Sequence, residues 1–242
     1  MASLRKTALV AGVFYLLTFV SIPTLFLYAQ VKDPNYVVGP GPDTPVIVGG
    51  VLEIIVALAC IGTAIALYPV VKRQNEGVAL GFVSARVLEA ATIFAGVVSL
   101  LSIVTLRQAG AGADALIAGQ ALSALHDWTR LLGQGFLPAV NALLLGSLMY
   151  QSRLVPRVLP VVGFIGAPLL VAGDIGVLFG LWGPVSVLPA IAALTLAVWE
   201  FSLGVYLVVK GFKPSSITDG MVASRSANTG VKDLSGAAPS AA

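Results

Sequence analysis

The chain has 242 residues, of which 57% are hydrophobic and 10% are charged. Soluble domains carry about 25% charged residues, so this composition excludes an ordinary soluble protein and indicates one that lies largely in a lipid bilayer. The net charge of +3 comes from basic residues scattered between apolar runs, which argues against nucleic acid as a partner. The single cysteine, Cys60, excludes a disulfide framework within one chain.

Six apolar runs are long enough to cross the hydrocarbon layer, which takes about 20 helical residues. They are predicted at residues 7–29, 45–71, 79–104, 121–150, 158–180 and 188–209. The predicted fold class is therefore all-α, a polytopic transmembrane bundle of six spans. The fourth run is long and contains the polar string "ALHDWTRLLGQG", so it is expected either to break or to begin outside the hydrocarbon.

The basic residues predict an orientation. Only Lys32 and Arg107 fall on one side of the predicted spans, whereas eight fall on the other: Arg5, Lys6, Lys72, Arg73, Arg153, Arg157, Lys210 and Lys213. Because basic residues collect on the cytoplasmic side, both termini are expected there. Residues 1–213 are expected to form the transmembrane domain, and residues 214–242, rich in Ser, Ala and Gly, a disordered cytoplasmic tail.

Polar residues inside the spans are the candidate functional residues. An ionised group costs about 3 kcal/mol in hydrocarbon even on the mildest scale, so such groups normally face the bundle interior or a water-filled cavity. The candidates for a substrate or proton path are Glu53, Arg86, Glu89, Asp127, Asn141, Asp174 and Glu200. His126, Arg130 and Gln134 are weaker candidates.

Neighbouring small residues support an interior position for two of these acids. Glu53 shares a helical face with Gly49, Ala57, Cys60 and Ala64, and Glu200 shares one with Ala193, Ala197 and Gly204. Small residues let helix backbones approach each other, so these faces are expected to be helix contacts.

The helix rise of about 1.5 Å per residue places the candidates at two depths. Four come out about 10–15 Å from the cytoplasmic side: Arg86, Glu89, Asn141 and Glu200. Glu53 and Asp174 come out about 24–27 Å deep, in the outer half, where Asp127 and Arg130 also fall. The sequence therefore predicts an inner polar cluster and an outer one.

On a regular helix the polar residues of the fourth span would form one stripe: Ser123, Asp127, Arg130, Gln134 and Asn141. His126 lies just off that stripe and is expected to be an interfacial contact. Asp127 and Arg130 are expected to form a structural ion pair that ties this span to its neighbours. Pro138 has no N–H for the carbonyl of Gln134, so a kink with a free carbonyl is expected there.

The charge balance and the absence of enzyme motifs bear on function. Five acids in the spans face only Arg86 and Arg130, so one or more carboxyls are expected to hold a proton in a low dielectric. The sequence contains no nucleophile elbow, phosphate-binding loop or His-Glu-x-x-His motif. One histidine, His126, is too few for an ordinary catalytic zinc site. No metal and no cofactor are therefore expected.

Several stretches resemble one family when they are taken together. They are "LRKTALVAGVFYLLTFVSIP", "VVGPGPDTPVIVGGVLEI", "YPVVKRQNEGVALGFVSARVLEA", "LHDWTRLLGQG", "NALLLGSLMYQSRLVPR" and "WEFSLGVYLVVKGFKP". The chain is similar over residues 3–214 to the bacterial membrane family catalogued as domain of unknown function 4386. The resemblance implies a multi-pass protein of the bacterial inner membrane and brings no established activity.

The family pattern is matched at Glu53, Arg86, Glu89, His126, Trp128, Asn141 and Glu200. The family usually has an apolar or aromatic residue in place of Arg130, and often proline in place of Gln134. The resemblance therefore argues against Arg130 and Gln134 as parts of a shared mechanism.

Two functions of different class fit the sequence. The first is a small-solute or proton-linked transporter, with an inner gate of Arg86, Glu89 and Glu200 and an outer vestibule made by the acids Glu53, Asp127 and Asp174. The second is a structural or accessory membrane protein whose buried charges only fix helix packing. An intramembrane lipid-modifying enzyme is a weaker third, because no complete catalytic constellation supports it. The expected partners are the lipid bilayer and a small solute or proton.

Overall fold

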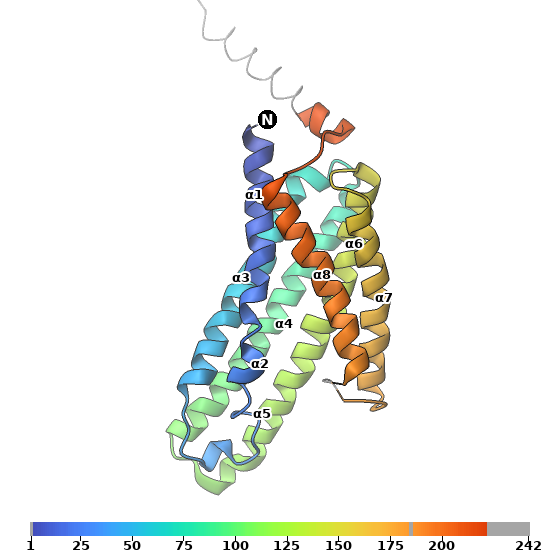
Figure 1. Ribbon diagram of the computed structural model, residues 1–242. Helices are drawn as coiled ribbons and strands as arrows, with labels where there is room; N and C mark the ends of the chain where they lie inside the picture. Colours follow the sequence, from blue (N-terminus) through green and yellow to red (C-terminus); the bar gives the residue numbers. More distant parts are fainter. Residues whose placement is uncertain (1, 184–185, 222–242) are drawn as a thin grey trace, which may run out of the picture.

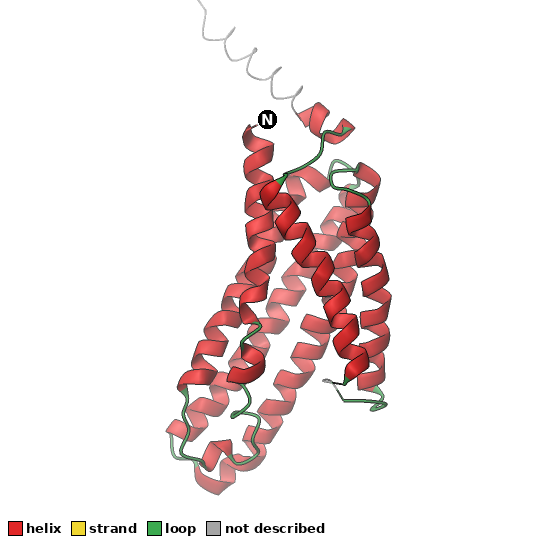
Figure 2. Ribbon diagram, viewed as in Figure 1, coloured by secondary structure: helices red, strands yellow, loops and turns green. Residues whose placement is uncertain are grey.

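The computed structural model describes residues 2–183 and 186–221, and that part of the chain is helical without a strand (Figures 1 and 2). The helices are α1 (Ala2–Leu17), η1 (Thr18–Ser21), α2 (Thr24–Leu27), η2 (Tyr36–Val38), α3 (Thr44–Val71), α4 (Glu76–Gln108), η3 (Gly112–Asp114), α5 (Ala115–Arg130), η4 (Leu131–Phe136), α6 (Leu137–Ser152), α7 (Val158–Leu178) and α8 (Val187–Val209).

Six stretches of these helices are long and apolar enough to cross a membrane. They are Leu4–Leu27, Thr44–Val71, Glu76–Gln108, Gly112–Ser152, Val158–Leu178 and Val187–Val209. The all-α fold class and the six predicted spans are confirmed. Large apolar side chains cover the outside of the bundle, among them Ile65 of α3 and Leu194 of α8, which are 69% and 65% exposed. The protein is a multi-pass membrane protein whose outer surface suits contact with lipid.

The small-residue faces predicted on α3 and α8 are helix contacts only in part. On α3 the predicted face is buried throughout, from Gly49 to Ala64. On α8 the prediction holds only near Gly204, since Ala193 is exposed. Gly204 lies where α1 crosses α8, and a Cβ atom on Gly12 of α1 would come within 2.7 Å of its carbonyl oxygen. Glycine is therefore required for this crossing, which Figure 1 shows on the near side of the bundle.

The fourth span neither breaks nor stays regular. Its α5 and α6 segments are joined by the π-helical turn η4, so that one helical rod runs over Gly112–Ser152. The N–H of Leu137 bonds to the carbonyl of Leu132, five residues back, and the next residue, Pro138, has no N–H. A kink was predicted at this place, and the structure has a π-helical turn there.

The end of the bundle that holds the loop between α2 and α3, which we call the outer end, extends beyond the short helices. The 33-residue α4 and the 41-residue fourth span project past the ends of α7 and α8, which have 21 and 23 residues (Figure 1). At about 1.5 Å per residue, both long helices exceed the ~30 Å hydrocarbon layer. The loop between α2 and α3 lies across their projecting ends, where Arg107 bonds to Asp43 and to the carbonyl of Gly39.

At the other end, the packed chain continues past α8. The N–H of Lys213 bonds to the carbonyl of Leu154 at 2.8 Å, and Ile217 is buried against the main hydrophobic core. The described chain reaches Met221, within the segment of residues 214–242 that was predicted as a tail. The rest of the predicted tail, residues 222–242, lies outside the described residues.

Candidate functional site

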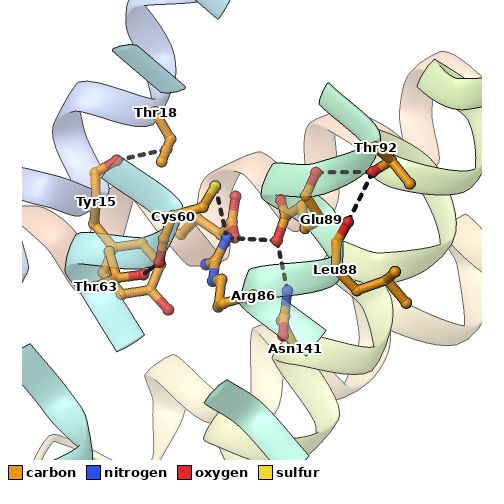
Figure 3. Close-up of polar contacts among 10 residues, drawn as sticks. Tyr15, Thr18, Cys60, Thr63, Arg86, Leu88, Glu89, Thr92 and Asn141 are labelled. Atoms are coloured by element: carbon orange, nitrogen blue, oxygen red, sulfur yellow. Dashed lines mark hydrogen bonds and ion pairs between the residues drawn. The ribbon is translucent and has the colours of Figure 1, made fainter. Parts of the chain in front are cut away.

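Arg86 of α4 is the centre of a buried polar group that we call the inner cluster (Figure 3). Its side chain is 1% exposed. Its Nη1 donates to Glu89 Oε2 at 3.0 Å, and its Nη2 donates to Glu200 Oε1 of α8 at 2.9 Å. The inner cluster consists of Tyr15, Cys60, Arg86, Glu89, Asn141 and Glu200.

Three further helices contribute to this cluster. Asn141 of α6 donates from Nδ2 to Glu89 Oε2 at 2.6 Å. Cys60 of α3 lies with its sulfur 3.7 Å from Arg86 Nη1. The guanidinium carbon lies 5.0 Å from the ring centroid of Tyr15 on α1, a favourable cation–π distance. The predicted common depth of Arg86, Glu89, Asn141 and Glu200 is confirmed by these direct contacts, which join helices far apart in sequence.

The inner cluster is balanced neither in charge nor in hydrogen bonds among the described residues. One guanidinium faces the two carboxyl groups of Glu89 and Glu200, so one negative charge is left over when both are ionised. Arg86 Nε and Asn141 Oδ1 are buried and have no hydrogen-bond partner among the described residues. Buried polar groups are normally satisfied, so each of these two atoms calls for an explanation such as a bound water, a bound ion or a functional role.

Glu53 occupies a separate position toward the outer end. It is 2% exposed. Tyr28, just after α2, donates from its hydroxyl to Glu53 Oε2 at 3.0 Å, and the Gln134 amide of η4 reaches Oε1 at 3.4 Å. Glu53 is thus held by neutral donors, with no cation among the described residues paired to it.

The histidine region differs from the expectation. Lys32 Nζ lies 2.5 Å from Asp127 Oδ1 and 2.9 Å from His126 Nδ1. Because a lysine ammonium can only donate, His126 Nδ1 acts as the acceptor. His126 is 2% exposed and meets the Tyr28 ring edge-on at 5.4 Å, so its side chain is buried within the bundle. Asp127, predicted to line the interior, has a side chain that is 56% exposed.

Arg130 takes no part in the predicted ion pair. Asp127 ties the fourth span to the loop between α2 and α3 through Lys32, whereas Arg130 forms no ion pair within the described chain. Asp174 of α7 is a further buried acid beside the fourth span. Asp174 is 5% exposed, and its Oδ2 has no partner among the described residues. It lies against Gly135 of η4, where any added Cβ atom would collide with it.

The predicted single stripe on the fourth span is wrong. Asp127 faces the outer surface, Gln134 faces Glu53, and Asn141 faces Glu89. The stripe assumed about 100° per residue throughout, and the π-helical turn between Arg130 and Leu137 breaks that assumption.

The loop between α2 and α3 carries its own polar contacts. Asp43 Oδ1 accepts from Arg107 Nε and from the Tyr36 hydroxyl, both at 2.7 Å, and Gln108 Nε2 donates to Oδ2 at 2.9 Å. The hydrogen bond from Arg107 is the main reason that the pKa of Asp43 lies well below its usual range. Burial, followed by the hydrogen bond to Asp43, raises the pKa of Tyr36 to about 12. These groups fasten the loop to the end of α4.

Four contact residues were missed by the sequence analysis. Tyr15, Tyr28 and Cys60 lie inside apolar runs and were not singled out as candidates, and Lys32 served only as an orientation signal. Only Cys60 carried a usable signal, because it shares the small-residue face of Glu53. Within the described chain, no group of three or more His, Cys, Asp or Glu side chains is arranged to hold a metal ion.

Comparison with known proteins places the chain in a family. No curated protein and no solved structure matches it. The sequence profile of the family described as Domain of unknown function (DUF4386) matches residues 10–211. That range contains the inner cluster, Glu53, Lys32 and the π-helical turn. It also contains most of the first candidate span and the whole of the other five. The chain therefore belongs to the DUF4386 family.

Proposed function

We propose that the protein is a small-solute or proton-linked transporter of the bacterial inner membrane. The observation that carries the proposal is the sharing of one buried guanidinium, that of Arg86, between the carboxyl groups of Glu89 and Glu200. In a low dielectric the second carboxyl must take up a proton, meet a cation or remain an unbalanced charge. The first two outcomes are the elementary steps of proton or cation transport.

Unpaired groups beside the ion pairs support the same proposal. Arg86 Nε offers a donor and Asn141 Oδ1 an acceptor at the centre of the bundle. A structural ion pair would be more stable with these atoms satisfied. A polar solute or a water molecule could accept a hydrogen bond from Arg86 Nε or donate one to Asn141 Oδ1. In this proposal Arg86, Glu89 and Glu200 form the inner gate.

The acids nearer the outer end are proposed to form a vestibule. Asp127 lies at its exposed edge with Lys32, while Glu53 and Asp174 are buried further in. Asp174 has an unpartnered oxygen and Glu53 bonds only to neutral donors, so either can accept a proton without breaking an ion pair. His126, Arg130 and Gln134 are assigned supporting contacts.

A structural or accessory role is the second candidate, and one observation favours it. Arg86 contacts Cys60 of α3, Glu200 of α8 and the Tyr15 ring of α1, so it could serve only to fix these helices against α4. Removing one partner of such a network is destabilising whether or not the protein transports anything. The two candidates must therefore be separated by flux, not by stability alone.

The test is a flux measurement in liposomes that hold the full-length protein and a pH-sensitive dye, with a panel of cations. We expect wild-type flux above that of empty liposomes and its loss in Glu200→Gln. The matched control is Glu76→Gln, the same chemical change at an exposed glutamate in the first turn of α4, which should leave flux unchanged.

One result would reject transport in favour of the structural role. It is wild-type flux no greater than that of empty liposomes, together with a lower thermal stability of Glu200→Gln.

We also propose that both chain termini face the cytoplasm, since eight of the basic residues near span ends lie on that side. Reporter fusions after Lys213 and within the loop of residues 34–44 test this orientation. A periplasmic signal from the fusion after Lys213 would reverse it and exchange the inner and outer labels.

A further inference from the structure

A pocket of about 220 Å³ opens at the end of the bundle where α1 begins and α8 ends. Basic side chains dominate its polar lining, which consists of Arg5, Lys210, Lys213, Thr218 and Asp219, with Phe212 as an apolar wall. The three cations and one carboxylate leave two positive charges. This pocket is remote from the inner cluster and has no part in the proposed transport function.

The wall of the pocket is a built structure. Gly211 turns the chain at a φ of 76°, in the region that favours glycine, directly after α8. Ile217 then anchors the following segment in the main hydrophobic core. Ser215 and Thr218 fix its shape, since the N–H of Ser215 bonds to Thr218 Oγ1 at 2.7 Å and the N–H of Thr218 to Ser215 Oγ at 3.4 Å. The lysines are thus held on a folded segment.

The cations of the pocket are not equally engaged. Arg5 donates to the carbonyls of Leu207 at 3.0 Å and Val208 at 2.6 Å, so it caps the C-terminus of α8. Lys210 and Lys213 are exposed, and neither pairs with a carboxylate within the described residues. Helix capping therefore accounts for the hydrogen bonds of the Arg5 guanidinium, whereas both lysine ammonium groups remain available to bind an anion.

We infer that this pocket binds the headgroup phosphate of an anionic phospholipid. It lies at the end of two membrane-spanning helices, where headgroups are found, and basic pockets between such helices bind anionic lipids. Val205 and Val209 on α8 and Leu9 on α1 are exposed apolar side chains next to it, suited to the acyl chains. The phosphate meets the two lysines, while Asp219 accepts hydrogen bonds from headgroup hydroxyls.

A general attraction between basic residues and the membrane surface is the competing explanation. It predicts that any two cations at this end of the bundle contribute equally. A specific pocket predicts that Lys210 and Lys213 contribute far more than an equal pair elsewhere. Lys72 and Arg73 form that pair, since they are exposed and follow α3 at the same end.

The experiment is native mass spectrometry of the full-length protein in detergent, titrated with phosphatidylglycerol or phosphatidylcholine. Wild type should retain phosphatidylglycerol in preference to phosphatidylcholine. In Lys210→Ala/Lys213→Ala, retention should fall about 10- to 30-fold. Lys72→Ala/Arg73→Ala should stay close to wild type, and Lys210→Arg/Lys213→Arg should keep most of the retention because it conserves the charge.

A second arm separates the lipid from a free phosphate compound. Soluble glycerol 3-phosphate is added in excess to the protein loaded with phosphatidylglycerol, and the lipid should stay bound because the acyl chains contribute to affinity. Displacement of the lipid would assign the pocket to a soluble phosphate ester and overturn the proposal. Equal losses in the two alanine double variants, or equal retention of the two lipids, would also overturn it.

Discussion

Two arginines on the same helix, Arg86 and Arg107 of α4, bind carboxylates in opposite settings. Arg86 is 1% exposed, is surrounded by helices and is shared between Glu89 and Glu200. Arg107 is 16% exposed, lies at the projecting outer end and pairs with Asp43 alone, on a loop. The comparison shows that the contribution of an arginine ion pair to the structure depends on its position along the membrane helix, since the residue type is the same in both pairs.

The difference follows from the surroundings of each guanidinium. At the outer end, Arg107 and Asp43 are both part-exposed, so water can solvate whichever partner is left alone and the pair fastens a loop at modest cost. Arg86 and Glu89 are only 1% and 6% exposed, so the loss of either charge leaves the other buried and unbalanced. The inner cluster is therefore expected to dominate the stability of the bundle, and the outer pair the order of one segment.

Replacing Arg86 should have the largest effect. Arg86→Met leaves the buried Glu89 and the part-buried Glu200 without a cation, which should cost about 3–5 kcal/mol of unfolding free energy. Unfolding in detergent, followed by circular dichroism, measures this loss. The triple variant Arg86→Met/Glu89→Gln/Glu200→Gln removes the stranded charges and should recover much of it, and Arg73→Met provides an exposed control. An Arg86→Met protein as stable as wild type would contradict the expectation that the inner cluster dominates the stability of the bundle.

Replacing Arg107 should have a smaller and local effect. Arg107→Ala removes bonds to Asp43 and to the carbonyl of Gly39, so the loop before α3 should lose order while the bundle keeps its unfolding temperature. Hydrogen exchange of residues 33–43 measures the change, with α8 as an internal reference. If α8 exchanges faster as well, the outer pair is not local, and the contrast with Arg86 fails.

Acid should weaken the same loop without any mutation. The folded state lowers the pKa of Asp43 from its ordinary value of 3.8, so its carboxylate stabilises the loop above that value. This stabilisation is lost as the pH falls below 3.8 toward the lower pKa of the folded state. Hydrogen exchange at about pH 6 and about pH 3, corrected for intrinsic rates, should show the loss. In Asp43→Asn the corrected exchange should be independent of pH.

The smallest effect is expected at Lys32. Its pair with Asp127 is half exposed, with side chains 30% and 56% exposed, so Lys32→Met should cost about 0.2–1 kcal/mol. The measurement is the same unfolding assay, with Asp127→Asn as a second variant. If the double variant costs no more than either single one, the pair accounts for the effect. A loss as large as that of Arg86→Met would show that water does not reach this site.

The sequence predicted the fold and the inner cluster because both depend on regular quantities. Span length follows from hydropathy, and a constant helix rise is enough to bring Arg86, Glu89 and Glu200 to one level. The contacts of Tyr15 and Cys60 could not be predicted, since they depend on which helices become neighbours.

The sequence analysis failed where the fourth helix ceases to be regular. Pro138 indicated a kink but not the π-helical form that the turn takes. The contact of His126 with Lys32 could not be predicted, because Lys32 lies 94 positions away in sequence on a loop.

The π-helical turn at Leu131–Phe136 sets the direction in which Asn141 of the inner cluster faces. Such a turn holds one residue more than the α-helical turn it replaces. If the same residues formed a regular α-helix, the extra residue would rotate Leu137–Ser152 by about 100° about the helix axis. Asn141 would then turn away from Glu89, to which it donates at 2.6 Å. A polar contact deep in the bundle thus depends on the form of the turn that precedes it, and a change of that turn to a regular helix would remove the contact while leaving every side chain of the cluster in the sequence.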